Sequence, residues 1–126
     1  MTAIPVSLEI TGELQSIDSH VALSLFRVTQ EALRNIQKHA AATQVRIHLS
    51  NDEALARLRI TDNGLGFELD RLNRNHGLGL TSMEERIRFL GGSVRIESAL
   101  GAGTNIRVSI PTRYAAVNHS ALNIVH

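Results

Sequence analysis

The chain has 126 residues, enough for one domain with its own core, and its hydrophobic and charged fractions, 43% and 20%, are those of ordinary globular proteins. It has no cysteine, which excludes disulfides, thiolate metal sites and cysteine nucleophiles. The net charge of +1 gives no electrostatic case for nucleic acid. Neither a spanning apolar run nor a signal peptide is visible, so we expect a cytoplasmic domain without direct membrane contact.

The first predicted elements are a strand and a long helix. Residues 6–10 alternate between apolar and polar up to Gly12, as in a strand. The polar run 16–19 is suited to capping a helix. Apolar residues then recur at helical spacing, without Gly or Pro, over 20–42. We therefore predict one amphipathic helix over 20–42, with Ala32, Ile36 and Ala40 toward the core.

The rest of the chain predicts two strand pairs and a second helix. Residues 45–49 and 55–60 read as a hairpin around a turn at 51–53. A glycine-rich loop over 62–79 precedes a helix over 80–90, which Gly91 and Gly92 stop. The last strands, around 94–96 and 106–110, flank a glycine turn.

This order predicts an α+β fold, a two-layer α/β sandwich with a mixed or antiparallel sheet and both helices on one face. We expect a single domain over 1–126, with 112–126 as a poorly ordered tail.

One face of the long predicted helix carries polar side chains suited to phosphate chemistry. Glu31, Asn35 and His39 follow each other at four-residue spacing, and Lys38 lies beside them. The Asn35 amide oxygen suits Mg²⁺, and the Glu31 carboxylate could orient or deprotonate a nucleophile. The Lys38 ammonium suits a phosphate oxygen. Spacing alone favours the simpler interpretation, a solvated polar face.

The glycine-rich segment is the second candidate site. Residues 62–66, Asp-Asn-Gly-Leu-Gly, follow a predicted strand, and residues 77–80, Gly-Leu-Gly-Leu, precede a predicted helix. Glycine permits close backbone approach to a ligand, and free N–H groups at a helix start suit phosphate. Asp62 could accept a hydrogen bond from an exocyclic amine such as that of adenine. A plain turn at 62–64 is an equal alternative, and Thr104 by itself is better explained as an ordinary strand residue.

Together these segments resemble the ATPase family shared by histidine kinases, gyrase-type topoisomerases and MutL-type repair proteins. Residues 27–40 resemble its N box, 62–67 its DNGxGF box and 77–80 its GLGL box. Residues 90–92 and 101–104 match the LGG and GxGT elements. The N-box wording is most similar to sensor kinases that pair with helix-turn-helix response regulators of the nitrate-sensor type. The resemblance covers about 21–111 and implies the Bergerat-type ATP-binding fold.

The resemblance also implies roles for individual residues. Asn35 would ligand Mg²⁺, Glu31 would support catalysis, and Lys38 and His39 would approach the phosphates of ATP. Asp62 would bind the adenine amino group with the help of Thr104. The remaining nucleotide-binding residues would be Gly64, Gly66, Gly77, Leu78, Gly79 and Leu80, which shape the adenine pocket, the lid and the phosphate site.

By this resemblance the chain would be the catalytic domain of a membrane-anchored bacterial sensor histidine kinase. It would bind ATP or ADP and transfer the γ-phosphate to a histidine on a separate dimerisation and phosphoacceptor domain, and a response regulator would follow indirectly. None of its own six histidines matches the acceptor motif. The alternatives are an ATP-dependent regulatory module or anti-sigma-type serine kinase of the same fold, and a hydrolytic ATPase of the topoisomerase or repair type.

Overall fold

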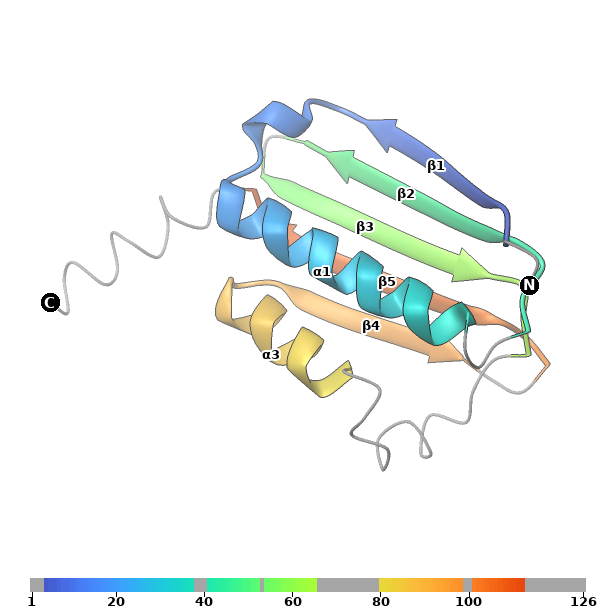
Figure 1. The fold of residues 1–126 in the computed structure, drawn as a ribbon. Helices are drawn as coiled ribbons and strands as arrows, with labels where there is room; N and C mark the ends of the chain where they lie inside the picture. Colours follow the sequence, from blue (N-terminus) through green and yellow to red (C-terminus); the bar gives the residue numbers. More distant parts are fainter. Residues whose placement is uncertain (1–3, 38–40, 53, 66–79, 99–100, 113–126) are drawn as a thin grey trace, which may run out of the picture.

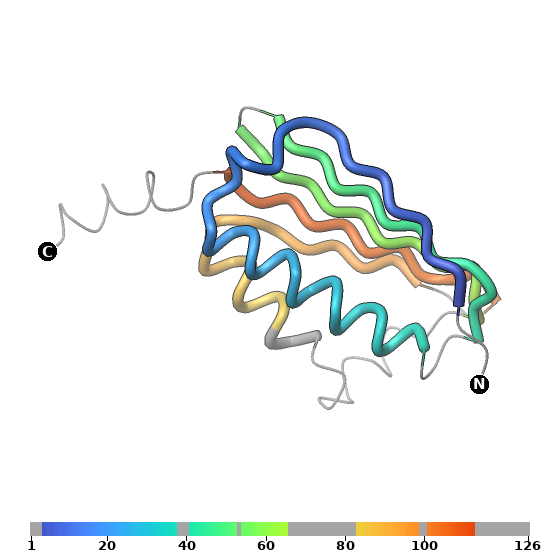
Figure 2. Tube along the Cα trace, turned by 45° about the horizontal axis from the view of Figure 1, so that its top comes forward, coloured from blue at the N-terminus to red at the C-terminus, as the bar shows by residue number. Residues whose placement is uncertain are grey.

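The computed structural model describes residues 4–37, 41–52, 54–65, 80–98 and 101–112. Five strands form one sheet in the order β1-β2-β3-β5-β4. Both helices cover the same face of that sheet, which confirms the predicted two-layer α+β fold (Figures 1 and 2). The elements are β1 (Val6–Thr11), a 3-10 turn η1 (Leu14–Ser16), α1 (Ser19–Asn35), β2 (Val45–Asn51), β3 (Leu55–Asp62), α3 (Leu80–Phe89), β4 (Ser93–Ser98) and β5 (Thr104–Pro111).

The sheet is mixed, as predicted. Strand β1 runs parallel to β2, whereas the pairs β2–β3, β3–β5 and β4–β5 are antiparallel. The Asp52 side chain closes the predicted β2–β3 hairpin, because its Oδ1 accepts hydrogen bonds from the backbone N–H groups of Ala54 and Leu55 at 2.9 and 2.8 Å. Within the described residues, no helix is both long and apolar enough to cross a membrane.

The core lies between the sheet and the two helices. Strand register places Ile47, Ile60, Ile106 and Ile96 in one row across four strands, on the helix-covered face. Alternation along each strand leaves polar residues on the opposite face. The helices contribute the buried side chains of Val21, Leu25, Val28, Ala32 and Ile36 from α1 and its C-cap, and of Met83, Ile87 and Leu90 from α3 and the residue after it.

Helix α1 begins as predicted and ends earlier than predicted. The Asp18 side chain accepts from the N–H of His20 at 2.8 Å and caps the first turn. The α-helix ends at Asn35, and Ala41 has a left-handed φ of 49°, so the predicted helix over 20–42 was wrong at its C-terminal end. Ala40 lies outside the described residues. The backbone N–H groups of Thr43 and Gln44 bond instead to the end of β3, as described below.

The other predicted ends agree closely with the structure. Gly91 has a φ of 84°, and the N–H of Gly92 donates to the carbonyl of Ile87 at 2.9 Å, which closes α3. Thr112, predicted to begin a poorly ordered tail, is instead 2% exposed and donates through its hydroxyl to Asn51 Oδ1 at 2.9 Å. The rest of that predicted tail, 113–126, lies outside the described residues.

Strand β1 shows an uneven covering of the sheet. Its apolar side chains face the helix side, yet Val6, Leu8 and Ile10 are 50%, 62% and 47% exposed. Figure 1 shows the reason: on this face α1 and α3 lie over the part of the sheet around β3, β5 and β4, and they do not reach β1 at the edge. Alternation correctly predicted this strand, but not that its apolar face is open.

Candidate functional site

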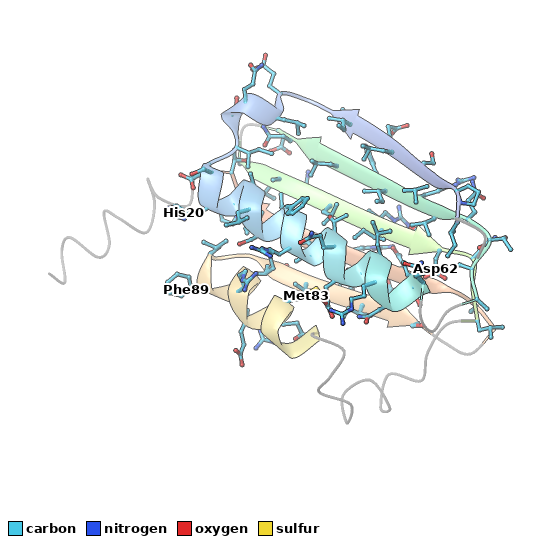
Figure 3. All side chains as sticks on the ribbon, in the orientation of Figure 1. His20, Asp62, Met83 and Phe89 are labelled. Atoms are coloured by element: carbon cyan, nitrogen blue, oxygen red, sulfur yellow. The ribbon has the colours of Figure 1, made fainter. Side chains whose placement is uncertain are left out.

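Four elements end or begin at one end of the molecule, where the candidate residues gather. Helix α1 and strand β3 run toward this end and finish at Asn35 and Asp62. Helix α3 and strand β5 start from it, at Leu80 and Thr104. Figure 3 shows Asp62 at this end, whereas His20 and Phe89 lie at the other. The fold thus collects residues that the sequence separates widely.

Asp62 is the most unusual polar residue of this end. It is only 5% exposed, and its Oδ1 accepts from the Gly64 N–H at 2.7 Å. Its Oδ2 is buried and has no hydrogen-bond partner among the described residues. Burial raises the pKa of this carboxyl above its ordinary value, opposed by hydrogen bonds from Gly64 and Thr104. A buried acceptor without a donor is costly, so the Oδ2 atom suits a ligand N–H.

The start of β5 is brought unusually close to Asp62. Gly103 has a φ of 75°, and a Cβ on it would lie 2.3 Å from the Asp62 carbonyl oxygen, so only glycine fits. Thr104 is the register partner of Asp62 and is 5% exposed. Its hydroxyl lies 2.9 Å from the hydroxyl of Ser98 on β4. The predicted residues Asp62, Gly64 and Thr104 are therefore in one place.

Asn63 has a structural role that the sequence did not reveal. Its Oδ1 accepts from the backbone N–H groups of both Thr43 and Gln44 at 2.9 Å, and its Nδ2 donates to the Thr43 hydroxyl at 2.8 Å. These bonds tie the chain that follows α1 to the end of β3. From the sequence, Asn63 was interpreted as part of a turn or of the DNGxGF box, and its only signal was its place between Asp62 and Gly64.

Helix α1 contributes the second half of the site. Glu31 is half-buried and lines a cleft of about 650 Å³ between α1 and α3, which Met83 and Arg86 line from α3. Met83 is labelled in Figure 3. Asn35, one turn further on, is 7% exposed. The predicted polar face is therefore not a simple solvated surface.

The candidate residues on the sheet and on α1 line different cavities. Asp62 and Thr104 line a hollow of about 530 Å³, which is separate from the cleft beside Glu31. Among the described residues, no three His, Asp or Glu side chains form a group that could hold a metal ion. Leu80 begins α3, but the other predicted site residues, Lys38, His39, Gly66, Gly77, Leu78 and Gly79, lie outside the described residues.

Residues 20–114 match the family of histidine kinase-, DNA gyrase B- and HSP90-like ATPases. The chain belongs to this family. The match spans nearly all of α1 and every later helix and strand up to the end of β5. The predicted recognition is thereby confirmed.

The relatives of this ATPase domain are sensor histidine kinases. The chain is 36% identical over 107 residues to sensor histidine kinase LiaS of Bacillus subtilis, covering 85% of this chain and 29% of that protein. It is 37% identical over 111 residues to the histidine-protein kinase/phosphatase DegS of Brevibacillus brevis, covering 87% of this chain and 28% of the relative. The chain therefore spans less than a third of these curated relatives, and they do not favour the serine-kinase alternative.

Solved structures agree on the fold. The blue-light activated histidine kinase EL346 of Erythrobacter litoralis superimposes with a TM-score of 0.69 at 20% identity, over 89% of this chain and 36% of that one. Its histidine kinase domain alone gives a TM-score of 0.65 at 18% identity, over 85% of this chain and 55% of that one. The mixed sheet with two helices on one face is thus the architecture of a histidine kinase ATPase domain.

Proposed function

We propose that this ATPase domain binds Mg²⁺-ATP at the end of the molecule where α1, α3, β3 and β5 meet. We further propose that it transfers the γ-phosphate to a histidine on a separate dimerisation and phosphoacceptor domain. A response regulator would take the phosphoryl group afterwards, and the domain would act on the cytoplasmic side of a membrane-anchored sensor. The family and the named relatives support this assignment.

The observation that carries the proposal is the unpartnered, buried Oδ2 of Asp62. A nucleotide with an exocyclic amine supplies the missing donor, and adenine has such an amine at the edge of its ring. The Gly64 N–H holds the other carboxylate oxygen, Oδ1, and Gly103 allows β5 to begin against the Asp62 backbone, which places Thr104 in register with Asp62. Recognition of adenine therefore rests on residues at the ends of β3 and β5.

The phosphates are assigned to the helix side of the site. The N-terminus of α3 at Leu80 offers free N–H groups and a partial positive charge to an anion. The Asn35 side chain carries an amide oxygen, a hard ligand that fits Mg²⁺ when phosphates and waters supply the rest of its shell. When bound, Mg²⁺ neutralises phosphate charge during transfer. Lys38, His39 and the glycines at 66, 77 and 79 remain assigned to this site from the family motif.

Glu31 is assigned the acid–base role. It lies one helical turn before Asn35 and lines the open cleft between α1 and α3, where an incoming imidazole has access. A carboxylate there can accept the imidazole proton and orient the attacking nitrogen, a contribution of about 10²–10⁴ in rate.

A transfer experiment in trans tests the proposal. The chain is mixed with labelled ATP and a dimerisation and phosphoacceptor domain supplied as a separate protein. We expect acid-labile phosphohistidine on the acceptor and no label on the chain itself. Glu31→Gln should keep ATP affinity within about twofold and slow transfer about 10²–10⁴-fold, whereas Asn35→Asp should impair both.

Glu85→Gln is the matched control, because Glu85 is an exposed carboxylate on α3 with no assigned role. Transfer by Glu31→Gln at the wild-type rate would reduce Glu31 to a surface carboxylate. Acid-stable label on a serine of a protein substrate would instead identify the serine-kinase alternative.

A further inference from the structure

The sheet face turned away from α1 and α3 carries a row of basic side chains. In strand register His48 lies opposite Arg59, Arg59 opposite Arg107, and Arg107 opposite Arg95. These residues alternate along their strands with the apolar residues that face the helices, so they lie on the uncovered face (Figure 2). We call these four residues the basic row.

The basic row is poorly compensated within the domain. Like charges directly opposite each other on neighbouring strands destabilise a sheet. The Asn105 amide oxygen accepts from Arg59 Nε at 3.3 Å, or with its amide turned over from Arg107 Nε at 3.2 Å, so one neutral acceptor serves two guanidinium groups. Arg107 also lies 3.6 Å from Glu97. Among the described residues, Arg95 forms no ion pair.

Other charges on this face do not cancel the row. Arg46 and Arg57 add two guanidinium groups beside it, and Arg57 is paired with Asp52 at 3.0 Å. His48 is 3.3 Å from Glu9 at the β1 end of the row. Among the described residues, five arginines thus share the face and its rim with three carboxylates, the third being Glu97, although the whole chain has a net charge of only +1. Positive charge is concentrated where the fold has no helix.

The spacing of the row selects the shape of an acidic partner. Neighbouring strands are about 4.7–4.9 Å apart, so the row presents one basic group per strand at that interval. Carboxylates three or four residues apart on a helix lie about 5–6 Å apart, close to the same interval. Residues on one face of an extended chain are about 6.6–6.8 Å apart, so their spacing does not match the interval between neighbouring strands. A helix lying across the strands matches the row better.

We propose that the basic row is a docking surface for a helix of a partner protein that carries glutamates or aspartates along one face. The row lies on the sheet face turned away from the helices, and of its four residues only Arg107 also lines the hollow beside Asp62. Arg59 and Arg95 do not line that hollow, so variants of these two residues test the surface separately from the nucleotide site. A membrane fits it less well, since none of the exposed large hydrophobic residues in the described part of the chain lies on this face. Nucleic acid fits less well too, because the described aromatic residues, Phe26 and Phe89, lie on the helices.

The test uses two synthetic helical peptides of identical composition. One carries glutamates four and seven residues apart on a single face, and the other spreads the same glutamates around the helix. Binding to the wild-type chain is measured by fluorescence anisotropy at low and at moderate salt. We expect the one-face peptide to bind about tenfold more tightly than the other and to weaken as salt rises.

Variants locate the binding. Arg59→Glu with Arg95→Glu should weaken the one-face peptide at least about tenfold. Arg88→Glu, a single charge reversal on α3 over the other face, should change it less than about twofold, whereas Arg59→Glu alone should already weaken it by more than that. ATP affinity and circular dichroism report whether each variant is folded, and Arg59→Gln with Arg95→Gln replaces the double reversal if that protein is unstable.

Equal binding of the two peptides would overturn the proposal, and so would unaltered binding by the row variants. Anionic vesicles or duplex DNA that bind through the same arginines, while the one-face peptide does not, would also overturn it in favour of a lipid or nucleic-acid surface.

Discussion

At the scale of single residues, burial of the Asp62 carboxylate lowers the stability of the domain. Its carboxyl is buried, and burial raises its pKa despite the hydrogen bonds from Gly64 and Thr104. A carboxyl whose folded pKa exceeds its unfolded value contributes stability below the unfolded pKa and loses it as pH rises through the folded pKa. At neutral pH, Asp62 is therefore a destabilising residue that the protein keeps for its ligand.

Asp62→Asn should consequently separate stability from binding. We expect ATP affinity to fall about tenfold to a hundredfold, because a hydrogen bond to a charged group contributes about 1.5–3 kcal/mol. The melting temperature of the ligand-free chain should rise at pH 7, and this gain should disappear below the ordinary aspartate pKa of 3.8. Calorimetry and thermal unfolding across pH measure the two effects. Unchanged ATP affinity would remove Asp62 from the site.

Gly101 and Gly103, in the turn before β5, allow a controlled test of the close approach between the start of β5 and Asp62. Gly101 and Gly103 have φ values of 80° and 75°, but a Cβ on Gly101 meets nothing within 4 Å, whereas one on Gly103 overlaps the Asp62 carbonyl oxygen. Gly101→Ala should cost about 1–2 kcal/mol in urea unfolding, from left-handed strain alone. Gly103→Ala should cost clearly more and also weaken ATP binding. Equal effects of both changes would show that the close approach is unimportant.

For single residues, the sequence motifs predicted which side chains lie together at the candidate site, but not the hydrogen bonds that position them. Asp62, Gly64 and Thr104 were predicted together, and the structure places them together. The roles of Asn63 and Ser98 were not predicted, because their partners Thr43 and Thr104 are set by chain folding and not by local spacing. A motif identifies a ligand-facing residue more readily than the residue that supports it.

At the scale of elements, periodicity predicted each strand and helix but misjudged the end of α1. The apolar pattern continues past Asn35, and neither Gly nor Pro interrupts it. By residues 43 and 44 the chain has left the helix, since their backbone N–H groups donate to Asn63 at the end of β3. Propensity is overridden by a tertiary contact, which a single sequence does not display. The exposure of the apolar face of β1 was not predicted either, because an alternating pattern does not show which elements cover a strand.

Asn63→Ala should loosen the joint between α1 and the sheet. The change leaves two backbone N–H groups without their acceptor, at a cost of about 1–3 kcal/mol. Amide hydrogen exchange at Thr43 and Gln44 should accelerate, while exchange in the middle of β3 changes little. Asn105→Ala is the control, because the Asn105 amide contacts only exposed side chains. Slow exchange at Thr43 and Gln44 in the Asn63 variant would contradict the proposed tie.

At the scale of the whole molecule, nucleotide binding should stabilise the domain as one unit, since its site joins both helices to the sheet. A ligand at a hundred times its Kd adds about 2.7 kcal/mol to the free energy of unfolding. We expect Mg²⁺-ATP at that concentration to raise the melting temperature by roughly 10 °C. EDTA should remove most of the shift if Asn35 and the phosphates share the metal. An equal shift with and without EDTA would argue against a metal-bridged site.

The edge position of β1 also has a consequence for how the chain reaches its fold. The pairs β2–β3 and β4–β5 are hairpins with short connections, so their ends meet at little entropic cost. Strand β1 pairs only with β2 in the described sheet, in parallel, and more than thirty residues, including α1, separate the end of β1 at Thr11 from the start of β2 at Val45. A contact of such long sequence separation forms late in the transition from the unfolded chain. The pairing of β3 with β5 is also long-range, since its register partners run from Asp62 with Thr104 to Leu55 with Pro111. We therefore expect the two hairpins to form first, and the sheet to be complete only after β3 has paired with β5 and β1 has docked on β2.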